Sequence, residues 1–512
     1  MSKFSSIYIL SLLALLLASF SGCEKKVAGK DEEEPEPAPE EFQRYKRGIV
    51  YDNNAQVYKS TYQILLPADY ENNVDTHYPV VYMLHGYGES GKDWNNWVTT
   101  IESLEKNGLQ PMIYVFPDCN NSYYCNYYDE KAMYMNMIVD DLVPLIDETY
   151  RTIADREHRA VMGYSMGGFG AMVLPLKNPD VFSISVPLSM SFRTDEQYMT
   201  ESQSGWDNQW GKIFGGKGHS GEARLTDYYK SHCPFYQFVP ENLNELSKVK
   251  WFLHCGDDEE QLLIANDNLH VQMRDYGYEH EFRIGDGGHS GDYWRNAVRE
   301  TLPWIEHVMK GGDEWTKVMG TVSLKSSVLN DDGSFSSKEY NEAEEKDGLA
   351  TYLVHRGIDR AIVDKCIGLL TQSGSIFQYM VLPCDLEIQS LEEWIAYYTS
   401  KYEVGKSVEK SQVIAIGDTG KDVWAKNDQF KRFYLIDADL SDDESVIVAE
   451  NEKFYFIWTT DDSPYYKDSN ALYLSCKTVE ADFEYRMYNG FGDNEEKVLY
   501  AIQKTSEKFK YQ

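Results

Sequence analysis

One serine in the sequence stands between glycines in a pattern that can produce a nucleophile. It is Ser165, in the stretch GYSMGG at 163–168. The apolar residues before it predict a buried strand and those after it predict a helix, so G-x-S-x-G fits a sharp strand-to-helix turn, the nucleophile elbow. Gly163 and Gly167 are expected there because a side chain at either position would collide with the neighbouring strand and helix. The bare pattern also suits a glycine-rich turn with a helix-capping serine.

A serine hydroxyl is a poor nucleophile unless a histidine, itself held by a carboxylate, removes its proton. Both residue types follow Ser165 in the order acid then histidine, each after a predicted strand. His289 lies in the glycine-rich stretch IGDGGHSGDYW, and the carboxylates Asp257, Asp258 and Glu259 cluster in HCGDDEEQLL. The sequence therefore predicts a serine–acid–histidine arrangement, with the acid one of these three carboxylates.

An attack on a carbonyl carbon also needs backbone donors for the oxygen that becomes negatively charged. The amide of Met166, directly after the serine, is one candidate. The amide of Tyr87 is the second, because it follows the strand that ends in VVYMLHG. We expect these two amides to form an oxyanion hole.

The first part of the chain alternates between strands and helices. Residues near 48–66 predict a leading antiparallel hairpin, and AMYMNMIVDDLVPLIDETY at 132–150 predicts a helix. Six short apolar runs bounded by turn residues suit buried strands, at 78–86, 111–118, 159–165, 182–189, 249–256 and 280–287. This alternation predicts an α/β domain over 43–312, with a mostly parallel, doubly wound sheet.

The stretch KGGDEW at 310–315 marks the expected boundary to a second domain, 313–512. There SQVIAIGD, FKRFYLIDADL, ESVIVAENEKFYFIWTTDD and ALYLSCKTVEADFEYRMY are interpreted as strands, with ENEK as a hairpin turn. Residues 390–402 and 494–509 are interpreted as helices. These patterns predict an α+β domain, whose function the sequence does not indicate. No internal repeat is apparent.

The first residues look like a targeting segment rather than part of the fold. The apolar run IYILSLLALLLASF ends in FSGC, so we expect a signal peptide at 1–22 and a lipidated Cys23, with an ordinary cleaved signal as the alternative. The acidic, proline-rich residues 23–42 predict a disordered linker. We expect a bacterial cell-envelope protein held to the membrane only by its lipid. The formal net charge of −34 argues against a nucleic-acid partner.

No metal site or other cofactor is expected. The eight cysteines contain no C-x-x-C pair, which argues against zinc. Cys119 and Cys125 are close in one predicted loop and are interpreted either as a disulfide or as two buried thiols. The acidic stretch DADLSDDE lacks the glycine and the glutamate of a calcium-binding EF-hand loop and is interpreted as a solvated turn.

Taken in order, several motifs resemble one family. YPVVYMLHGYGESGKDW, VFPDCNNSYY, GYSMGGFGAM, HCGDDEEQL and GGHSGDYW are similar to the carbohydrate esterases that include feruloyl and acetylxylan esterases, akin to esterase D and the mycolyltransferases. The resemblance covers about residues 45–310 and implies an α/β-hydrolase fold and metal-independent serine catalysis on esters, often acyl groups of plant polysaccharides. The family places its acid three residues after the strand-ending glycine. That position holds Glu259, which is therefore preferred, with Asp258 as the alternate acid.

The resemblance also suggests substrate-binding residues. Ser122 and Tyr123 would line an acyl or sugar pocket, and Trp206 and Trp210 could stack on a sugar or an aromatic acyl group, with simple packing as the alternative. Two other functions stay open at this point. One is an acyltransferase of mycolyltransferase type that uses the same residues, and the other is an inactive glycan-binding surface lipoprotein.

Overall fold

The computed structural model describes residues 44–50, 60–259, 261–312, 349–372, 379–441, 446–488 and 494–509. The expected signal peptide (1–22), the lipidation site Cys23, the linker (23–42) and the start of the second domain at 313 lie outside these residues. Within the described part of the chain, no helix combines the length and the apolar character needed to cross a membrane.

Residues 44–312 form a mostly parallel sheet from the strands that the apolar runs predict. Its strand order is β1-β2-β4-β3-β5-β6-β7-β8. β1 and β2 form the expected antiparallel hairpin, β2 is antiparallel to β4, and the strands from β4 to β8 in this order run parallel. The α/β class is confirmed. The strands are β1 Tyr45–Val50, β2 Ser60–Leu65, β3 Val80–Leu84, β4 Ile113–Pro117, β5 Arg159–Tyr164, β6 Ile184–Leu188, β7 Lys250–Gly256 and β8 Glu281–Gly285.

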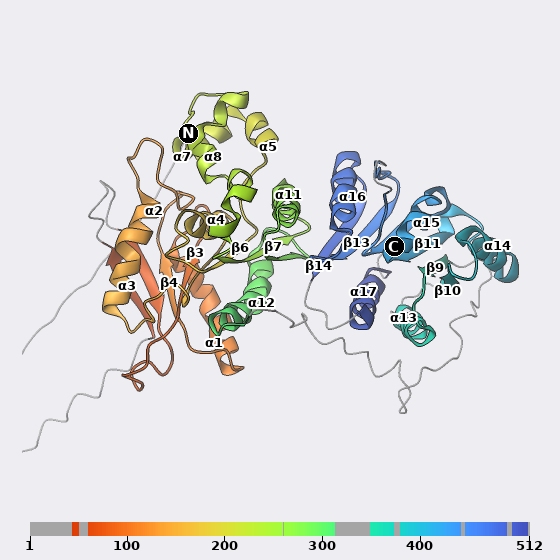
Figure 1. The fold of residues 1–512 in the computed structure, drawn as a ribbon, viewed down its shortest axis with the longest axis horizontal. Coiled ribbons are helices and arrows are strands. Elements are labelled where there is room, and N and C mark those ends of the chain that lie inside the picture. Colours follow the sequence, from red (N-terminus) through yellow and green to blue (C-terminus); the bar gives the residue numbers. More distant parts are fainter. Residues whose placement is uncertain are drawn as a thin grey trace, which may run out of the picture. The chain divides into compact units, whose positions relative to one another are not determined.

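Helices cover both faces of this sheet. Figure 1 shows α11 and α12 on opposite sides of β7, and α1 and α12 share a core with Met83, Met162 and Val186 of the strands. Strands covered on both faces are apolar throughout, as in β3, where all five residues are buried. The helices are α1 Asn95–Lys106, α2 Tyr134–Asn136, α3 Val143–Thr149, α4 Met166–Lys177, α5 Asp195–Thr200, α6 Gln203–Gly205, α7 Gly211–Phe214, α8 Asp227–His232, α9 Pro234–Gln237, α10 Leu243–Leu246, α11 Gln261–Asp275 and α12 Gly291–Met309. Short 3-10 and π-helical segments are η1 Gly91–Trp94, η2 Met137–Leu142, η3 Trp206–Trp210, η4 Gly221–Arg224 and η5 Pro240–Asn242.

The C-terminal part has a different architecture from the one expected. Its strands all run parallel, in the order β14-β13-β12-β11-β9-β10, and most are separated by helices. The α+β expectation is therefore wrong for this part, which is also α/β. The strands are β9 Leu349–His355, β10 Tyr379–Asp385, β11 Ser411–Ile416, β12 Arg432–Ile436, β13 Phe454–Thr460 and β14 Asp482–Tyr488. The helices are α13 Arg360–Gln372, α14 Leu391–Tyr402, η6 Val408–Lys410, η7 Gly417–Thr419, α15 Gly420–Trp424, η8 Asn427–Gln429, α16 Tyr466–Val479 and α17 Asn494–Lys508.

Two local errors explain the wrong class. The apolar residues of ALYLSCKTV, expected to be a strand, belong to α16. ENEK is a turn, but the described residues before it, 446–449, form no strand, so it does not join a hairpin. The helices at 390–402 and 494–509 are confirmed as α14 and α17.

The two sets of strands meet in one sheet of fourteen strands. β8 and β14 pair in antiparallel fashion, with Ile284 opposite Met487. The order from β4 to β8 is the same as the order from β10 to β14 when each set is numbered along the chain. This shared strand order is not apparent from the sequence, which shows no internal repeat.

Candidate active site

Ser165 lies at the turn between β5 and α4 in a strained backbone conformation. Its φ and ψ are 57° and −117°, a region that non-glycine residues rarely adopt. A Cβ at Gly163 would overlap the carbonyl group of Gly167, and one at Gly167 would overlap the carbonyl group of Leu84. The reason given above for both glycines is thus confirmed: the turn is closed too tightly for side chains there.

Ser165, His289 and Glu259 form a chain of hydrogen bonds at the carboxyl ends of β5, β8 and β7. The Nε2 atom of His289 is 2.9 Å from the Ser165 hydroxyl oxygen. The Nδ1 atom of His289 is 2.6 Å from a carboxylate oxygen of Glu259. An ionised carboxylate only accepts hydrogen bonds, so Nδ1 carries the proton and the lone pair of Nε2 faces the serine. This tautomer is the one that can remove the hydroxyl proton.

Two residues that the sequence did not single out hold Glu259 in place. Its carboxylate is fully buried and accepts a short hydrogen bond from the Ser189 hydroxyl. The indole N–H of Trp294 donates to the Ser189 oxygen at 2.8 Å. The same indole packs edge-on against the His289 ring, with centroids 4.8 Å apart. Ser189 ends the apolar run predicted for β6, so its place at a carboxyl end was the available signal.

The other two candidate acids do not contact His289. Asp258 is exposed, and its amide donates to the carbonyl oxygen of Gly287 at 3.1 Å. Asp257 is buried, accepts from the Gly287 amide at 3.2 Å and forms an ion pair with Arg486. Burial raises the pKa of Asp257 to about 6, and the positive charge of Arg486 opposes this rise. The contacts therefore favour Glu259 as the acid.

The loop with Tyr87 lies close to the start of α4. The carbonyl groups of Leu84 and His85 border Gly167, and Met166 is the first residue of α4, where helix amides lack partners within the helix. Buried His85 anchors this loop: its Nδ1 donates to the carbonyl oxygen of Gly86 at 2.9 Å, and its Nε2 accepts from a loop amide at 3.1 Å. Burial lowers the pKa of His85, so the ring is neutral. The expected oxyanion donors thus lie on neighbouring, well-anchored segments.

The expected substrate-binding residues are mostly buried. The Ser122 hydroxyl accepts a hydrogen bond from the amide of Tyr124 at 3.0 Å. The buried Tyr123 ring packs against the exposed ring of Tyr87, with the ring centroids 6.1 Å apart. Trp206 and Trp210 present no face to solvent, since both indoles are fully buried. The stacking role expected for the two tryptophans is therefore not supported, and packing within the helical insert explains them.

Two further expectations concern cysteines and acidic residues. Cys119 and Cys125 are free, buried thiols, the second of the two alternatives.

The acidic stretch that begins at Asp437 was expected to be a solvated turn. Asp437 is instead buried: it accepts a hydrogen bond from the Thr460 amide at 2.9 Å and forms an ion pair with Lys497 at 2.8 Å. The next residues, 442–445, lie outside the described part.

Three carboxylates near the site lie close enough to hold a cation. Oxygens of Asp257, Asp258 and Asp286 lie within 4.8 Å of one another. The guanidinium of Arg486 already forms ion pairs with Asp257 and Asp286, so a positive charge is supplied by the chain itself.

Comparison with known proteins gives matches to this half of the chain. Residues 57–305 match the model of the esterase family, described as "Putative esterase". An endo-1,4-β-xylanase/feruloyl esterase of Xylanibacter ruminicola is 23% identical over 282 residues, which cover 51% of this chain but only 32% of that protein. An acetyl esterase of Caldicellulosiruptor saccharolyticus is 23% identical over 262 residues, 49% of this chain and 93% of that protein. A solved ferulic acid esterase structure is 27% identical and covers 52% of this chain and 100% of its own, with a TM-score of 0.44.

Proposed function

We propose that this chain is a carboxylic ester hydrolase that works through an acyl-enzyme on Ser165, a proposal that the match of residues 57–305 to the esterase family model supports. The observation that carries the proposal is the hydrogen-bonded chain from Ser165 through His289 to Glu259. Its three members come from loops far apart in the sequence, and the tautomer of His289 suits a general base.

In the first half of the reaction, the Ser165 oxygen attacks the ester carbonyl carbon while Nε2 of His289 takes the hydroxyl proton. The carbonyl oxygen becomes negatively charged and accepts hydrogen bonds from the amides of Met166 and Tyr87. Glu259 stabilises the imidazolium that forms. The tetrahedral intermediate then expels the alcohol, which receives the proton from His289 and leaves an acyl group on Ser165.

In the second half, His289 removes a proton from water, and the hydroxide adds to the acyl carbon. Collapse of this second intermediate releases the carboxylic acid and returns the proton to Ser165. No metal is needed for either half, because protein groups supply the base, the acid and the oxyanion donors. An acyltransferase would differ only in using an alcohol in place of water.

We also propose that the ester is an acyl group on a plant polysaccharide, with ferulate and acetate as the leading acids. The names of two relatives, a feruloyl esterase and an acetyl esterase, support this class. The Tyr87 ring, 45% exposed beside the expected oxyanion loop, offers a flat surface to an aromatic acid. Rates on methyl ferulate, acetylated xylan and p-nitrophenyl acetate would rank these acids. A rate confined to p-nitrophenyl acetate would contradict the polysaccharide proposal.

Replacing Ser165 by alanine tests the mechanism. Turnover is expected to fall on the order of a millionfold, because the three residues act as a unit. A fluorophosphonate probe should label the wild type and not the variant. Equal labelling of the two would remove Ser165 from the mechanism, and transfer to an added alcohol in preference to water would favour the acyltransferase.

A further inference from the structure

The two α/β parts of the chain are equivalent strand by strand. The order β4-β3-β5-β6-β7-β8 repeats as β10-β9-β11-β12-β13-β14. The pairing registers then show which residues of the two parts are equivalent. Val80 of β3 pairs with Arg159 of β5, and in the same way Ala350 of β9 pairs with Ser411 of β11. Because each central strand pairs with its neighbour in the same register, the strand residues of the second part can be assigned equivalents in the first.

The turn after β11 copies the turn that holds Ser165. Gly417 follows β11 as Ser165 follows β5, and both have a positive φ, 62° and 57°. The amide of Ser191 donates to the Ser165 carbonyl at 3.0 Å, and the amide of Asp439 donates to the Gly417 carbonyl at 2.9 Å. The position of the nucleophile is therefore held by a glycine in the second part.

The acid loop is copied as well. Asp257 follows β7 by one residue and Asp461 follows β13 by one residue, and each amide donates at 3.1 Å to the carbonyl of the last residue of the next strand. Two residues further on, Glu259 in the first part corresponds to Ser463 in the second. The sequence holds no histidine after His355. The positions equivalent to Ser165 and Glu259 therefore hold a glycine and a serine, so the second part lacks the nucleophile and the acid at these places.

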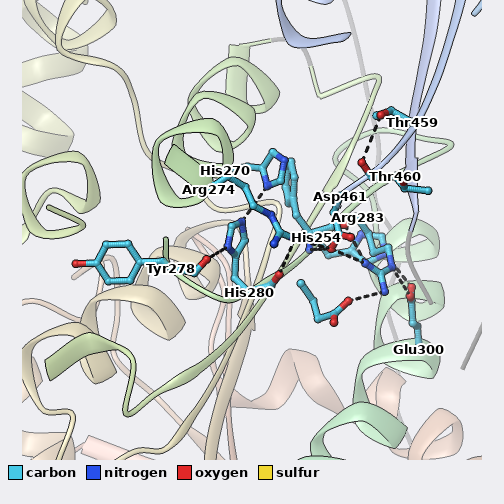
Figure 2. Close-up of polar contacts among 12 residues, drawn as sticks. His254, His270, Arg274, Tyr278, His280, Arg283, Glu300, Thr459, Thr460 and Asp461 are labelled. Atoms are coloured by element: carbon cyan, nitrogen blue, oxygen red, sulfur yellow. Dashed lines mark hydrogen bonds and ion pairs between the residues drawn. The ribbon is translucent and has the colours of Figure 1, made fainter. Parts of the chain in front are cut away.

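The two copies exchange equivalent ion pairs where β8 meets β14. Arg283 of β8 pairs with Asp461 of the second copy at 3.4 Å, and Arg486 of β14 pairs with Asp257 of the first. Each aspartate also accepts a strand amide of the opposite copy, at 3.1 Å for Asp461 and 3.2 Å for Asp257. Figure 2 shows the Arg283 side, with Asp461 and Glu300 beside the guanidinium.

Only the Arg486 side reaches the proposed catalytic residues. Asp257 lies two residues before Glu259 and accepts the Gly287 amide of the loop that carries His289. Arg486 also pairs at 2.7 Å with Asp286 of that loop. Its guanidinium therefore connects the loop that carries Glu259 with the loop that carries His289. A guanidinium can do this because it is planar and has several N–H donors. On the opposite side Arg283 pairs with Asp461 of the second copy and with Glu281 and Glu300 of its own, none of which lies in the loops of Glu259 and His289.

We propose that the C-terminal part is a non-catalytic copy of the esterase core whose Arg486 positions the Glu259 and His289 loops of the active copy. This inference rests on the proposed function. Arg486 touches neither substrate nor reacting atoms, so it is a positioning residue. Ester hydrolysis would then depend on a part of the chain that supplies no catalytic residue to the proposed reaction.

The test compares the same change at the two equivalent positions, Arg486→Gln and Arg283→Gln, in the full chain. Each removes a buried guanidinium from the β8–β14 pairing, so both should lower thermal stability. For Arg486→Gln we expect kcat on p-nitrophenyl acetate to fall on the order of a hundredfold with KM little changed, because a misplacement of about 1 Å is enough for such a loss. Arg283→Gln should keep a kcat close to that of the wild type.

The pH profile separates positioning from loss of folded protein. A displaced Glu259 stabilises the His289 imidazolium less, so the acid limb of kcat/KM should move to lower pH in Arg486→Gln and not in Arg283→Gln. A smaller folded fraction would lower kcat/KM by the same factor at every pH, so the acid limb of the profile would stay at the same pH. Equal losses in both variants with an unmoved limb, or wild-type kcat in Arg486→Gln, would overturn the proposal.

If Arg486→Gln does not fold, Arg486→Lys gives the answer. One ammonium group cannot span both Asp257 and Asp286 as the guanidinium does, so kcat should still fall and the limb should shift in the same direction. An unchanged kcat and limb in Arg486→Lys would overturn the proposal. Ser165→Ala is measured in parallel: turnover that survives in it contradicts the proposed function itself, whatever the arginine variants do.

Discussion

Glu259 stands in a run of acidic residues, yet its surroundings differ from those of its neighbours. Its carboxylate is buried and bonded to His289 and Ser189, whereas Asp258 points to solvent. Isosteric amides can therefore separate their roles. Glu259→Gln is expected to lower kcat by about four orders of magnitude, as when the acid of a serine triad is neutralised. Asp258→Asn should hydrolyse p-nitrophenyl acetate close to the wild-type rate, and the reverse result would make Asp258 the acid.

At this scale, local sequence is informative where a backbone turn demands particular residues. The glycines around Ser165 could be predicted because their reason is steric and local. The position of Ser189 at the end of a predicted strand was visible in the sequence, but its hydrogen bond to Glu259 was not, because that bond depends on β6 and β7 being adjacent. The same limit explains Trp206: an indole in an insert looks available for stacking until the insert folds over it.

Among the elements, strands were easier to predict than their pairing. Each apolar run of the first part became a strand, whereas the second part was assigned the wrong class. Residues 471–479 are apolar on the side that packs on β13 and β14, and a short amphipathic helix of this kind resembles a strand by composition alone. Since α16 separates β13 from β14, missing this helix hid the connection that lets the two strands run parallel.

The contact of α11 with α16 gives a pH-dependent prediction. Burial raises the pKa of Asp267 to about 7, and its bond of 2.8 Å from Asn470 opposes this rise. The folded pKa lies above the unfolded one, so the wild type loses stability as pH rises from about 4 to 7. Asp267→Asn has no such loss. Its free energy of unfolding relative to the wild type should increase with pH by up to about 1.4 kcal/mol per unit in this range.

Urea unfolding between pH 4.5 and 7.5 would measure this difference. Asp275→Asn, at the exposed end of the same helix, is the control. Burial by itself raises the pKa of Asp275, but the hydrogen bonds from Lys467 and Tyr466 together with the charge of Lys467 outweigh it and hold the pKa below its usual value. Its carboxylate is therefore ionised in both states above pH 4.5, and the relative stability of Asp275→Asn should stay flat. A flat curve for Asp267→Asn would contradict the buried, protonated carboxyl group.

For the molecule as a whole, the second copy covers the edge of the first. In a chain that ends at residue 312, β8 would become an edge strand and Asp257 would lose its partner Arg486, whereas Arg283 would keep Glu281 and Glu300. Bare edge strands pair with other chains. The shortened chain is expected to aggregate and to unfold at a lower temperature than the full chain. A monomeric, equally stable fragment in size-exclusion chromatography and thermal unfolding would contradict this.

The antiparallel pairing of β8 with β14 has one more consequence. A contact between two equivalent copies has approximate twofold symmetry, so the first copy of one chain can accept the second copy of another through the same ion pairs. The contact itself does not distinguish the two partners, so the choice between them depends on protein concentration. Refolding at high protein concentration is therefore expected to give dimers in which the first copy of each chain pairs with the second copy of the other. Each active site in such a dimer would be complete, with Arg486 supplied by the other chain.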